Sequence, residues 1–275
     1  HGVGPERYVI VHGTLDAPCI ALGQDVYEAL SRSVTKVVNC AEMVNLAIGR
    51  EEMLDWSARG IQTVLSFCRD AKADLRFTSS SAVFPDRGGP WPEAPAIVWA
   101  GCTGYGAAKI AAEVAIRTSG VSSAIVRLPS LYDLDSPNPR DIYEIILATS
   151  FRAGNMPRSL EFPMTDVNAA AAFLLGPVTA PGAPIYNLMA DQCIVPDDAS
   201  ALSAKDWLAK VALEPGIAKV IADFPDTLRA DATFVNIAAR TTWERISSLP
   251  FEDISDSDAL LTRRVAAYQS DPALI

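Results

Sequence analysis

Short apolar runs alternate along the chain with longer stretches in which apolar positions recur every three or four residues. A run of four to eight apolar residues is typical of a buried strand, and the longer spacing is typical of a helix packed on a sheet. Alternation of the two indicates a parallel sheet with helical crossovers. The strands predicted in this way are Tyr8–Val11, Lys36–Cys40, Asp74–Val83, Ser123–Leu128 and Pro184–Met189.

The amphipathic stretches predict helices between and after these strands. Beyond about residue 200 the pattern becomes irregularly helical, with Trp207 and Trp243 expected as packing anchors. The predicted fold class is therefore α/β, a Rossmann-like doubly wound parallel sheet with a smaller, mostly helical C-terminal part. The predicted helices are Asp25–Ser31, Glu51–Ala71, Gly104–Thr118, Ile142–Ala153 and Val167–Leu175.

Two parts are expected from this order of elements. Residues 1–134 and 164–190 would form the sheet core, and residues 135–163 and 191–275 a smaller part over the strand ends. In open parallel sheets, ligands bind in the crevice outside the carboxyl ends of the strands. The smaller part is therefore expected to bind the substrate.

Composition and charge narrow the classes of partner. The 275 residues are 49% hydrophobic and 20% charged, which allows a substantial core. With 23 basic and 33 acidic residues, the net charge of −10 argues against nucleic acid or an anionic membrane as a partner. The longest nearly continuous apolar stretch, Ala169–Leu175, is too short to span a bilayer. Without a secretory signal pattern either, the chain is expected to be cytoplasmic.

Cysteines and histidines exclude several kinds of site. The spacing of the cysteines includes no CxxC pair, so zinc and dithiol redox sites are not expected and the thiols are predicted to be free. Neither His1 nor His12 is well placed for a Ser-His-Asp hydrolase. The cysteines are Cys19, Cys40, Cys68, Cys102 and Cys193.

Tyr105 and Lys109 are the strongest candidates for chemistry. They are four residues apart on a predicted helix, so they share one face. An ammonium beside a phenol favours the phenolate, which is expected to lower the pKa of the tyrosine and make it a proton donor or acceptor near neutral pH. By itself, the spacing is just as typical of a surface pair. A serine run favours the functional interpretation, because Ser80 ends a strand facing the start of this helix and could hydrogen-bond a substrate carbonyl.

The set Ser80, Tyr105 and Lys109 resembles the catalytic triad of extended short-chain dehydrogenases/reductases. More narrowly, the chain resembles the terminal thioester reductase domains of non-ribosomal peptide synthetases, polyketide synthases and carboxylic acid reductases. The segments that carry this resemblance follow one another in the family's order along nearly the whole chain. They are Val11–Leu15 with Ile20–Gly23, Val38–Ala41, Gly104–Lys109 with Ala112 and Glu113, Val126–Ser130, and Met164–Val167.

The resemblance implies an NADPH cofactor and an acyl thioester substrate on the phosphopantetheine arm of an acyl or peptidyl carrier protein. Ser80 and Tyr105 would stabilise the oxyanion and supply the proton, while Lys109 would hold the nicotinamide ribose. The product would be an aldehyde, or an alcohol after a second reduction, and the chain would be part of a multidomain synthase. The residues implied to bind the cofactor are Thr14, Leu15, Asn39, Cys40, Ala41, Lys109 and Pro129.

The sequence also departs from the family pattern. Thr14 stands where the family has an aspartate at the adenine, Pro129 replaces a glycine, and Thr165 replaces an aspartate. The strand, glycine-rich phosphate loop, helix and second strand with which the family opens have no match. The dinucleotide-binding core, residues 1–134 and 164–190, is therefore expected to be incomplete, without the usual loop for the pyrophosphate.

Other functions stay open at this point. A non-reducing domain that releases its product by Dieckmann-type cyclisation would need no cofactor. A catalytically silent fragment could dock a carrier protein, and a sugar-nucleotide epimerase or dehydratase would share the triad. Four other charged residues are expected to be structural: Glu113 in a salt bridge, Arg127 as an anchor of its strand end, and Arg263 with Arg264 as a solvated pair.

Overall fold

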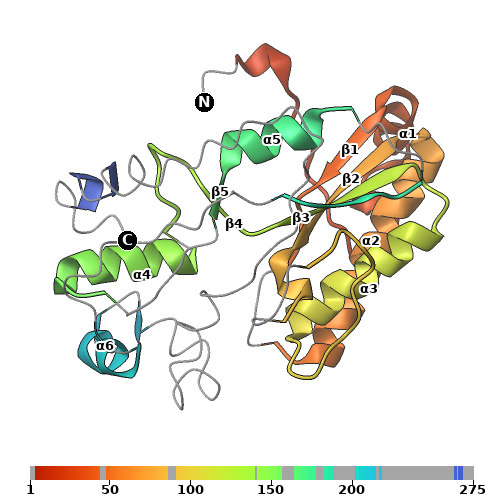
Figure 1. Ribbon diagram of the computed structural model, residues 1–275. Helices are drawn as coiled ribbons and strands as arrows, with labels where there is room; N and C mark the ends of the chain where they lie inside the picture. Colours follow the sequence, from red (N-terminus) through yellow and green to blue (C-terminus); the bar gives the residue numbers. More distant parts are fainter. Residues whose placement is uncertain are drawn as a thin grey trace.

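A four-stranded parallel sheet lies at the centre of the protein, in the order β1-β2-β3-β6 (Figure 1). The computed structural model describes residues 4–43, 48–85, 91–139, 141–156, 164–177, 182–188, 202, 204–214, 217–218, 263–264 and 266–268. The strands of the central sheet are β1 (Lys36–Asn39), β2 (Asp74–Ser80), β3 (Ser123–Leu128) and β6 (Ile185–Asn187). A second, two-stranded parallel sheet pairs β4 (Ser130–Tyr132) with β5 (Met164–Asp166).

The helices that the sequence predicted are all present, and their ends differ from the predicted ones by no more than two residues. A sixth described helix follows in the C-terminal part, and short 3-10 turns are η1 (Pro5–Arg7), η2 (Pro18–Ala21) and η3 (Ser81–Val83). The helices are α1 (Gln24–Ser33), α2 (Arg50–Ala71), α3 (Gly104–Thr118), α4 (Ile142–Ala153), α5 (Val167–Leu175) and α6 (Ala204–Val211).

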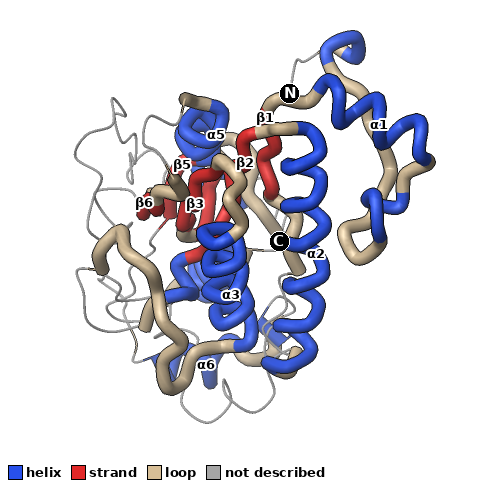
Figure 2. Tube along the Cα trace, turned by 90° about the vertical axis from the view of Figure 1, so that its right-hand side faces the viewer, coloured by secondary structure: helices blue, strands red, loops and turns tan. Residues whose placement is uncertain are grey.

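Helices cover both faces of the central sheet (Figure 2). Adjacent residues of a strand point to opposite faces, and β3 shows this directly. Ile125 packs with Leu65 of α2 and Ile116 of α3, whereas Val126 packs with Leu174 of α5. Because helices on both faces bury both sets of side chains, every residue of β3 is buried. The predicted doubly wound parallel sheet is confirmed.

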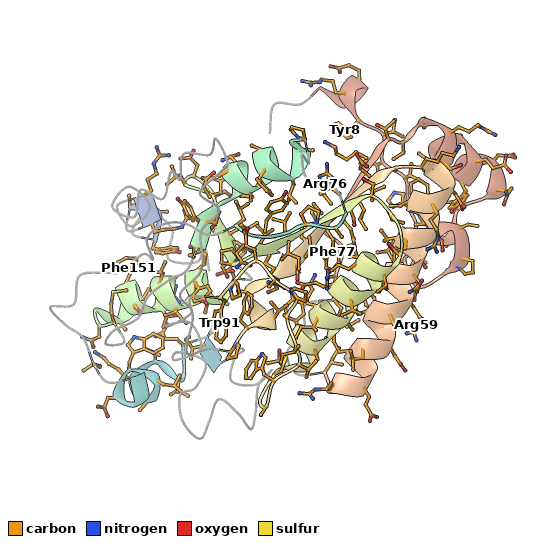
Figure 3. All side chains as sticks on the ribbon, turned by 45° about the vertical axis from the view of Figure 1, so that its right-hand side comes forward. Tyr8, Arg59, Arg76, Phe77, Trp91 and Phe151 are labelled. Atoms are coloured by element: carbon orange, nitrogen blue, oxygen red, sulfur yellow. The ribbon has the colours of Figure 1, made fainter. Side chains whose placement is uncertain are left out.

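The predicted first strand, Tyr8–Val11, is wrong. These residues form no ladder with any described residue, and their side chains are exposed, Val9 by 86% and Ile10 by 70%. Tyr8 lies on the outside of the molecule, away from the sheet (Figure 3). An apolar run becomes a strand only where a neighbouring strand takes up its backbone hydrogen bonds, and in the described structure β1 pairs with β2 alone.

The third predicted strand is three residues too long. The strand β2 ends at Ser80 rather than Val83, because the Ser80 hydroxyl accepts a hydrogen bond from the Ala82 backbone N–H at 3.2 Å. A side chain that satisfies a backbone donor in this way favours a turn over a continued strand. Residues Ser81–Val83 accordingly form the 3-10 turn η3.

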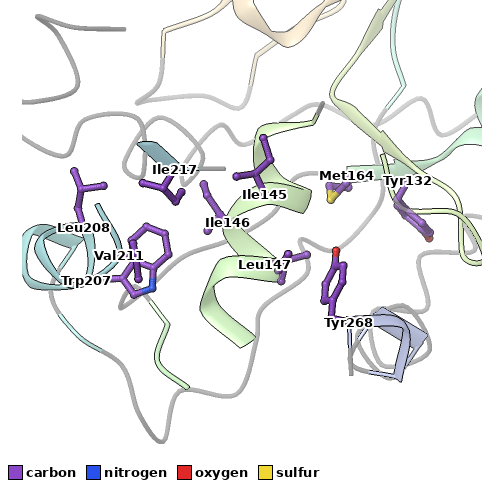
Figure 4. Close-up of a cluster of buried hydrophobic side chains, with 11 residues drawn as sticks. Tyr132, Ile145, Ile146, Leu147, Met164, Trp207, Leu208, Val211, Ile217 and Tyr268 are labelled. Atoms are coloured by element: carbon purple, nitrogen blue, oxygen red, sulfur yellow. The ribbon is translucent and has the colours of Figure 1, made fainter. Parts of the chain in front are cut away.

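A second apolar cluster forms beyond the small sheet (Figure 4). Trp207 of α6 is fully buried there, and its indole N–H donates to the Asn155 carbonyl at 3.1 Å. The expected anchoring role of Trp207 is thus confirmed, whereas Trp243 lies outside the described residues. Ile146 of α4 and Tyr268 pack into the same cluster. The boundaries proposed for the two parts, 1–134 with 164–190 and 135–163 with 191–275, stay a prediction.

None of the helices that the structure describes is both long and apolar enough to cross a lipid bilayer.

Candidate active site

Polar side chains gather at the carboxyl end of the central sheet. The strand β2 extends past β1, since Asn39, the last residue of β1, is paired with Phe77. Ser80 therefore stands beyond the end of its neighbour, at the edge where parallel sheets bind ligands. Its hydroxyl accepts from Ala82 N and also hydrogen-bonds the phenol of Tyr105.

The first turn of α3 brings Tyr105 to this position. Thr103 caps the helix, with its hydroxyl accepting from the Gly106 N–H at 3.0 Å. Gly106 faces η3 so closely that an added Cβ would lie 2.3 Å from the Ala82 carbonyl oxygen. A glycine at this position lets the helix approach the turn after β2, and Tyr105 consequently reaches Ser80.

Lys109 lies one turn further along α3 and points the same way. Its Nζ donates to the Thr78 carbonyl oxygen at 2.8 Å and lies 3.2 Å from Glu42 Oε2. The ammonium stands 5.6 Å from the centre of the Tyr105 ring and 4.8 Å from that of Phe77, which occupies the middle of the sheet (Figure 3). The structure thus brings Ser80, Tyr105 and Lys109 together, as the sequence predicted, although the surface-pair interpretation of Tyr105 and Lys109 was equally open.

The electrostatic expectation for Tyr105 was wrong. Burial raises its pKa to about 12, and the negative charge of Glu42 acts in the same direction, while the hydrogen bond from Ser80 lowers it. Burial also lowers the pKa of Lys109, and Glu42 opposes this. The Glu42 carboxylate balances the ammonium charge that was expected to favour the phenolate. Tyr105 is consequently a protonated group at neutral pH, suited to donate a hydrogen bond or a proton.

Sequence reasoning missed Glu42. Its side chain is 9% exposed and that of Lys109 3%, so this is a buried ion pair rather than a surface contact. Glu42 lies beyond the end of β1, two residues after Cys40, in the loop at the same edge as Ser80. A carboxylate just after a strand end was the available signal, but nothing local indicated which cation it meets.

A cleft of about 390 Å³ opens beside β1. Four of the predicted cofactor residues line it: Leu15, Asn39, Cys40 and Ala41. The Asn39 side chain is fixed there, because its Oδ1 accepts from the Ala41 N–H at 3.1 Å. The remaining walls come from Ile20, Val37, Val38, Val64 and Phe67.

The other predicted cofactor residues lie outside this cleft. Thr14 is exposed in the loop before η2, where its hydroxyl donates to Asp16. Pro129 is buried between β3 and β4, and Lys109 stands with the triad. The cleft and the triad are linked through the chain, because Ala41 lines the cleft and directly precedes Glu42, which pairs with Lys109.

A buried ion pair between Arg127 and Glu113 stabilises the carboxyl end of the central sheet. Arg127 forks onto Glu113, with Nε donating to Oε1 at 2.9 Å and Nη2 to Oε2 at 2.6 Å, and Ser79 Oγ donates to Oε1 at 2.6 Å. Both charged residues are at most 2% exposed. Arg127 also donates to the Ala94 carbonyl oxygen at 2.9 Å. The structural roles predicted for Glu113 and Arg127 are confirmed.

This network fixes the segment that begins at Trp91. Asn187, at the end of β6, donates from its side chain to the Trp91 carbonyl oxygen at 2.8 Å, and its backbone N–H donates to Glu93 at 2.7 Å. The Trp91 ring stacks on the Phe84 ring, whose centre lies 4.7 Å from the Arg127 guanidinium carbon. Trp91 thereby holds its segment against the strand ends below the sheet (Figure 3).

In the part of the chain that the structure describes, no three histidine, cysteine or carboxylate side chains lie close enough together to hold a metal ion. Four cysteines, Cys19, Cys40, Cys68 and Cys102, are free thiols as predicted. Cys193 lies outside the described residues.

A comparison with models of known protein families identifies the family to which this chain belongs. The family model described as "Male sterility protein", a model of an NAD-binding domain, matches residues 4–169. The chain belongs to this family. The match includes Ser80, Tyr105, Lys109 and the cleft beside β1, so the site described above lies within the region that defines the family. A comparison with curated proteins found no match.

Solved structures resemble this male sterility family member over most of its length. The terminal R domain from the myxalamid PKS-NRPS biosynthetic pathway matches with a TM-score of 0.76 and 18% identity, covering 96% of this chain and 75% of the R domain. L-threonine dehydrogenase from Phytophthora infestans matches with a TM-score of 0.55 and 17% identity over 90% and 83% of the two chains. A GDP-L-fucose synthetase from Naegleria fowleri, bound to NADP, matches with a TM-score of 0.59 and 13% identity over 98% and 84%.

These matches confirm the expected relationship. The chain is a member of the male sterility family, and it shares the fold of the R domain and of the other solved structures.

Proposed function

We propose that this chain is an NADPH-dependent reductase that releases a carrier-bound acyl thioester as an aldehyde. The observation that carries the proposal is the meeting of Ser80 and Tyr105 at the carboxyl edge of the sheet, with Lys109 on the same face of α3. Membership of an NAD-binding family and the fold shared with an R domain support it. An acyl or peptidyl carrier protein within a multidomain synthase is the partner that this chemistry requires.

The residues fit a reduced nicotinamide on the side of the triad. The cleft beside β1 offers apolar walls, with the side chain of Asn39 fixed in it and Ala41 at its border. Lys109 adds a hydrogen-bond donor beside Glu42, which follows the cleft residue Ala41 in the chain. Leu15, Asn39, Cys40, Ala41 and Lys109 would therefore hold the cofactor, which supplies a hydride when bound.

The chain's own residues would then stabilise charge and deliver a proton. Ser80 and Tyr105 would donate hydrogen bonds to the thioester carbonyl oxygen, on which negative charge grows as the hydride adds to carbon. Tyr105 is suited to this because burial and Glu42 keep it protonated, with a pKa of about 12. A transfer of its proton to that oxygen gives a hemithioacetal. Lys109 would bind the cofactor ribose, and its positive charge would offset that of Glu42.

The balance of the reaction is simple. One hydride and one proton add across the carbonyl, and the C–S bond then breaks as the hydroxyl proton passes to the thiolate. One NADPH is oxidised to NADP⁺, and the thioester becomes one aldehyde and one thiol. Reduction of the aldehyde to an alcohol would consume a second NADPH in the same way.

The test uses the full chain with NADPH and an acyl-pantetheine thioester. Cofactor oxidation at 340 nm and aldehyde trapping should both report turnover, and Tyr105→Phe should lower kcat by about 10²- to 10⁴-fold. Tyr8→Phe, at an exposed residue far from the triad, is the control and should behave as wild type. Absence of NADPH oxidation by the wild type, or an unchanged rate in Tyr105→Phe, contradicts the proposal. Release of a cyclised product without NADPH would favour the Dieckmann-type function instead.

A further inference from the structure

Glu42 and Lys109 form a compact pair of opposite charges next to the triad, and Glu42 directly follows Ala41, which lines the cleft. The ammonium and the carboxylate are 3.2 Å apart, and both side chains are at least nine-tenths buried. An ammonium has three N–H donors, of which the Thr78 carbonyl and Glu42 take two. Among the described residues, no third acceptor for the Lys109 ammonium and no second donor to the Glu42 carboxylate is present, so both groups keep capacity for a hydrogen bond to a ligand.

A structural role alone explains this pair poorly. Bringing two charges out of water costs free energy that their attraction often only balances, so a buried pair is weak evidence for a stabilising role. The chain already holds this edge together by other means, among them the fork of Arg127 on Glu113. The Glu42 pair instead follows directly on Asn39, Cys40 and Ala41, which line the cleft.

A donor beside an acceptor is complementary to a pair of neighbouring hydroxyl groups. One hydroxyl oxygen can accept from the ammonium while a hydroxyl proton is donated to the carboxylate, and hydrogen bonds to charged groups are stronger than those between neutral groups. A vicinal diol supplies both groups at the right separation. An aliphatic or aromatic ligand portion offers neither.

We propose that Glu42 is a cofactor-binding residue, whose carboxylate accepts a hydrogen bond from the vicinal hydroxyls of the nicotinamide ribose while Lys109 donates to them. This inference rests on the proposed function, which already gives Lys109 a contact with the ribose. The new element is Glu42: with it, the diol would meet two charged groups, the Lys109 ammonium and the Glu42 carboxylate, instead of the ammonium alone. Binding through Glu42 also orients Lys109, because the carboxylate holds the ammonium in place before the ligand arrives.

The experiment measures NADPH binding to the full chain by fluorescence titration, without substrate and without turnover. Glu42→Gln keeps the size of the side chain and removes its charge, and we expect it to raise the Kd for NADPH about tenfold or more. Glu52→Gln, at an exposed residue in the first turn of α2, is the matched control and should leave the Kd unchanged. Circular dichroism and thermal unfolding check that each variant is folded.

A second ligand separates the diol from other effects. An NADPH analogue that lacks the 2′-hydroxyl of the nicotinamide ribose should bind the wild type more weakly, and Glu42→Gln should change its Kd less than twofold. If Glu42→Gln does not fold, Glu42→Asp replaces it, since this variant keeps the charge and withdraws it by one methylene. Its loss of affinity should again be larger for NADPH than for the analogue.

Three results would overturn the inference. Equal Kd values of wild type and Glu42→Gln for NADPH would remove Glu42 from the binding site and leave the proposed function intact. An equal loss for NADPH and the deoxy analogue would show that the carboxylate acts without contacting the diol. No binding of NADPH by the wild type would overturn both this inference and the proposed function.

Discussion

Gly106 and Ala82 approach each other so closely that no side chain fits between them. A Cβ at residue 106 would lie 2.3 Å from the Ala82 carbonyl oxygen and 3.0 Å from Cys102 Sγ. The obstacle is backbone, which cannot rotate away as a flexible side chain can. This contact sets the distance between α3 and the turn after β2, and therefore between Tyr105 and Ser80.

Gly106→Ala should consequently reduce both stability and activity. In a helix interior, glycine to alanine normally stabilises by about 1 kcal/mol. Here the new methyl group forces α3 away from η3, and overpacking of this kind destabilises by roughly 1–3 kcal/mol. Urea unfolding measures the free-energy change, and the rate of NADPH oxidation measures the displacement of Tyr105.

Gly60→Ala is the matched control for this change. Gly60 is buried in the middle of α2, but an added Cβ would meet only Leu15 Cβ, at 3.8 Å, which is an ordinary contact. This variant should be as stable as the wild type or up to about 1 kcal/mol more stable. The prediction is supported if the free energy of unfolding falls in Gly106→Ala and does not fall in Gly60→Ala. It is contradicted if both variants are more stable than the wild type.

The titration of Tyr105 gives a prediction for pH. Its pKa is raised to about 12, so the folded state binds this proton more tightly than the unfolded state does. The resulting stability is fully present below about pH 10, the usual tyrosine pKa, and is lost as the pH rises through about 12. The difference in tyrosinate absorbance at 295 nm between wild type and Tyr105→Phe should show this late ionisation.

Glu42→Gln should move that ionisation to lower pH, because it removes a negative charge that raises the pKa of Tyr105. The basic limb of the rate profile should move in the same direction if Tyr105 donates the proton. Glu52→Gln, whose carboxylate is exposed on α2, serves again as the control. A Tyr105 that titrates at the same pH in wild type and Glu42→Gln would disprove the coupling.

The pair Glu113–Arg127 should show strong coupling in a double-mutant cycle. Removing one partner leaves the other buried without its counter-charge, so Glu113→Gln and Arg127→Met should each destabilise by roughly 3–5 kcal/mol. The double variant should be less destabilised than the sum of the two, because it leaves no unpaired charge. Urea unfolding of all four proteins gives the coupling energy.

The exposed pair of Glu28 and Arg32 on α1 is the comparison for this cycle. Their side chains are 46% and 71% exposed, and the charged atoms lie 3.4 Å apart. A pair of this kind contributes little to stability, because water and salt screen the two charges. A coupling at Glu113 and Arg127 no larger than that on α1 would contradict the role assigned to burial.

Arg263 and Arg264 should differ sharply, although they are neighbours in the sequence. Arg264 is 1% exposed, and its Nη2 donates to Glu144 Oε1 at 2.7 Å, whereas the Arg263 side chain is 51% exposed and pairs with Asp135. The expected solvated pair is thus wrong for Arg264. Arg264→Met should destabilise by roughly 3–5 kcal/mol, since it leaves Glu144 buried and unpaired.

Arg263→Met should cost at most about 1 kcal/mol. Thermal unfolding of the two variants, side by side, measures the difference. Equal effects would show that the contact of Arg264 with Glu144 does not hold the C-terminal part on α4.

The sequence predicted the helices well because their signal is local. In α2 and α3 the apolar spacing and the propensities of the residues both follow from neighbours along the chain. The relation of Tyr105 to Lys109 was predictable for the same reason, since helix geometry alone puts residues four apart on one face. The strand β3 was predictable too, because burial on both sides of the sheet favours the adjacent apolar residues Ala124, Ile125 and Val126.

Contacts between distant segments could not be predicted in this way. Tyr8–Val11 has the pattern of a strand, but pairing needs a neighbour that the pattern does not specify. The pKa of Tyr105 was predicted to fall, but burial raises it, and the carboxylate of Glu42, more than 60 residues away in the sequence, acts in the same direction.

The amino-acid sequence by itself determined the five predicted helices, the strands of the central sheet and the placement of Tyr105 and Lys109 on one face of α3. Only the tertiary structure decided which charge meets which, as for Glu42 with Lys109 and for Arg264 with Glu144. The physical reason is range. Periodicity and propensity act over a few residues, whereas burial and charge pairing depend on which segments the fold brings together.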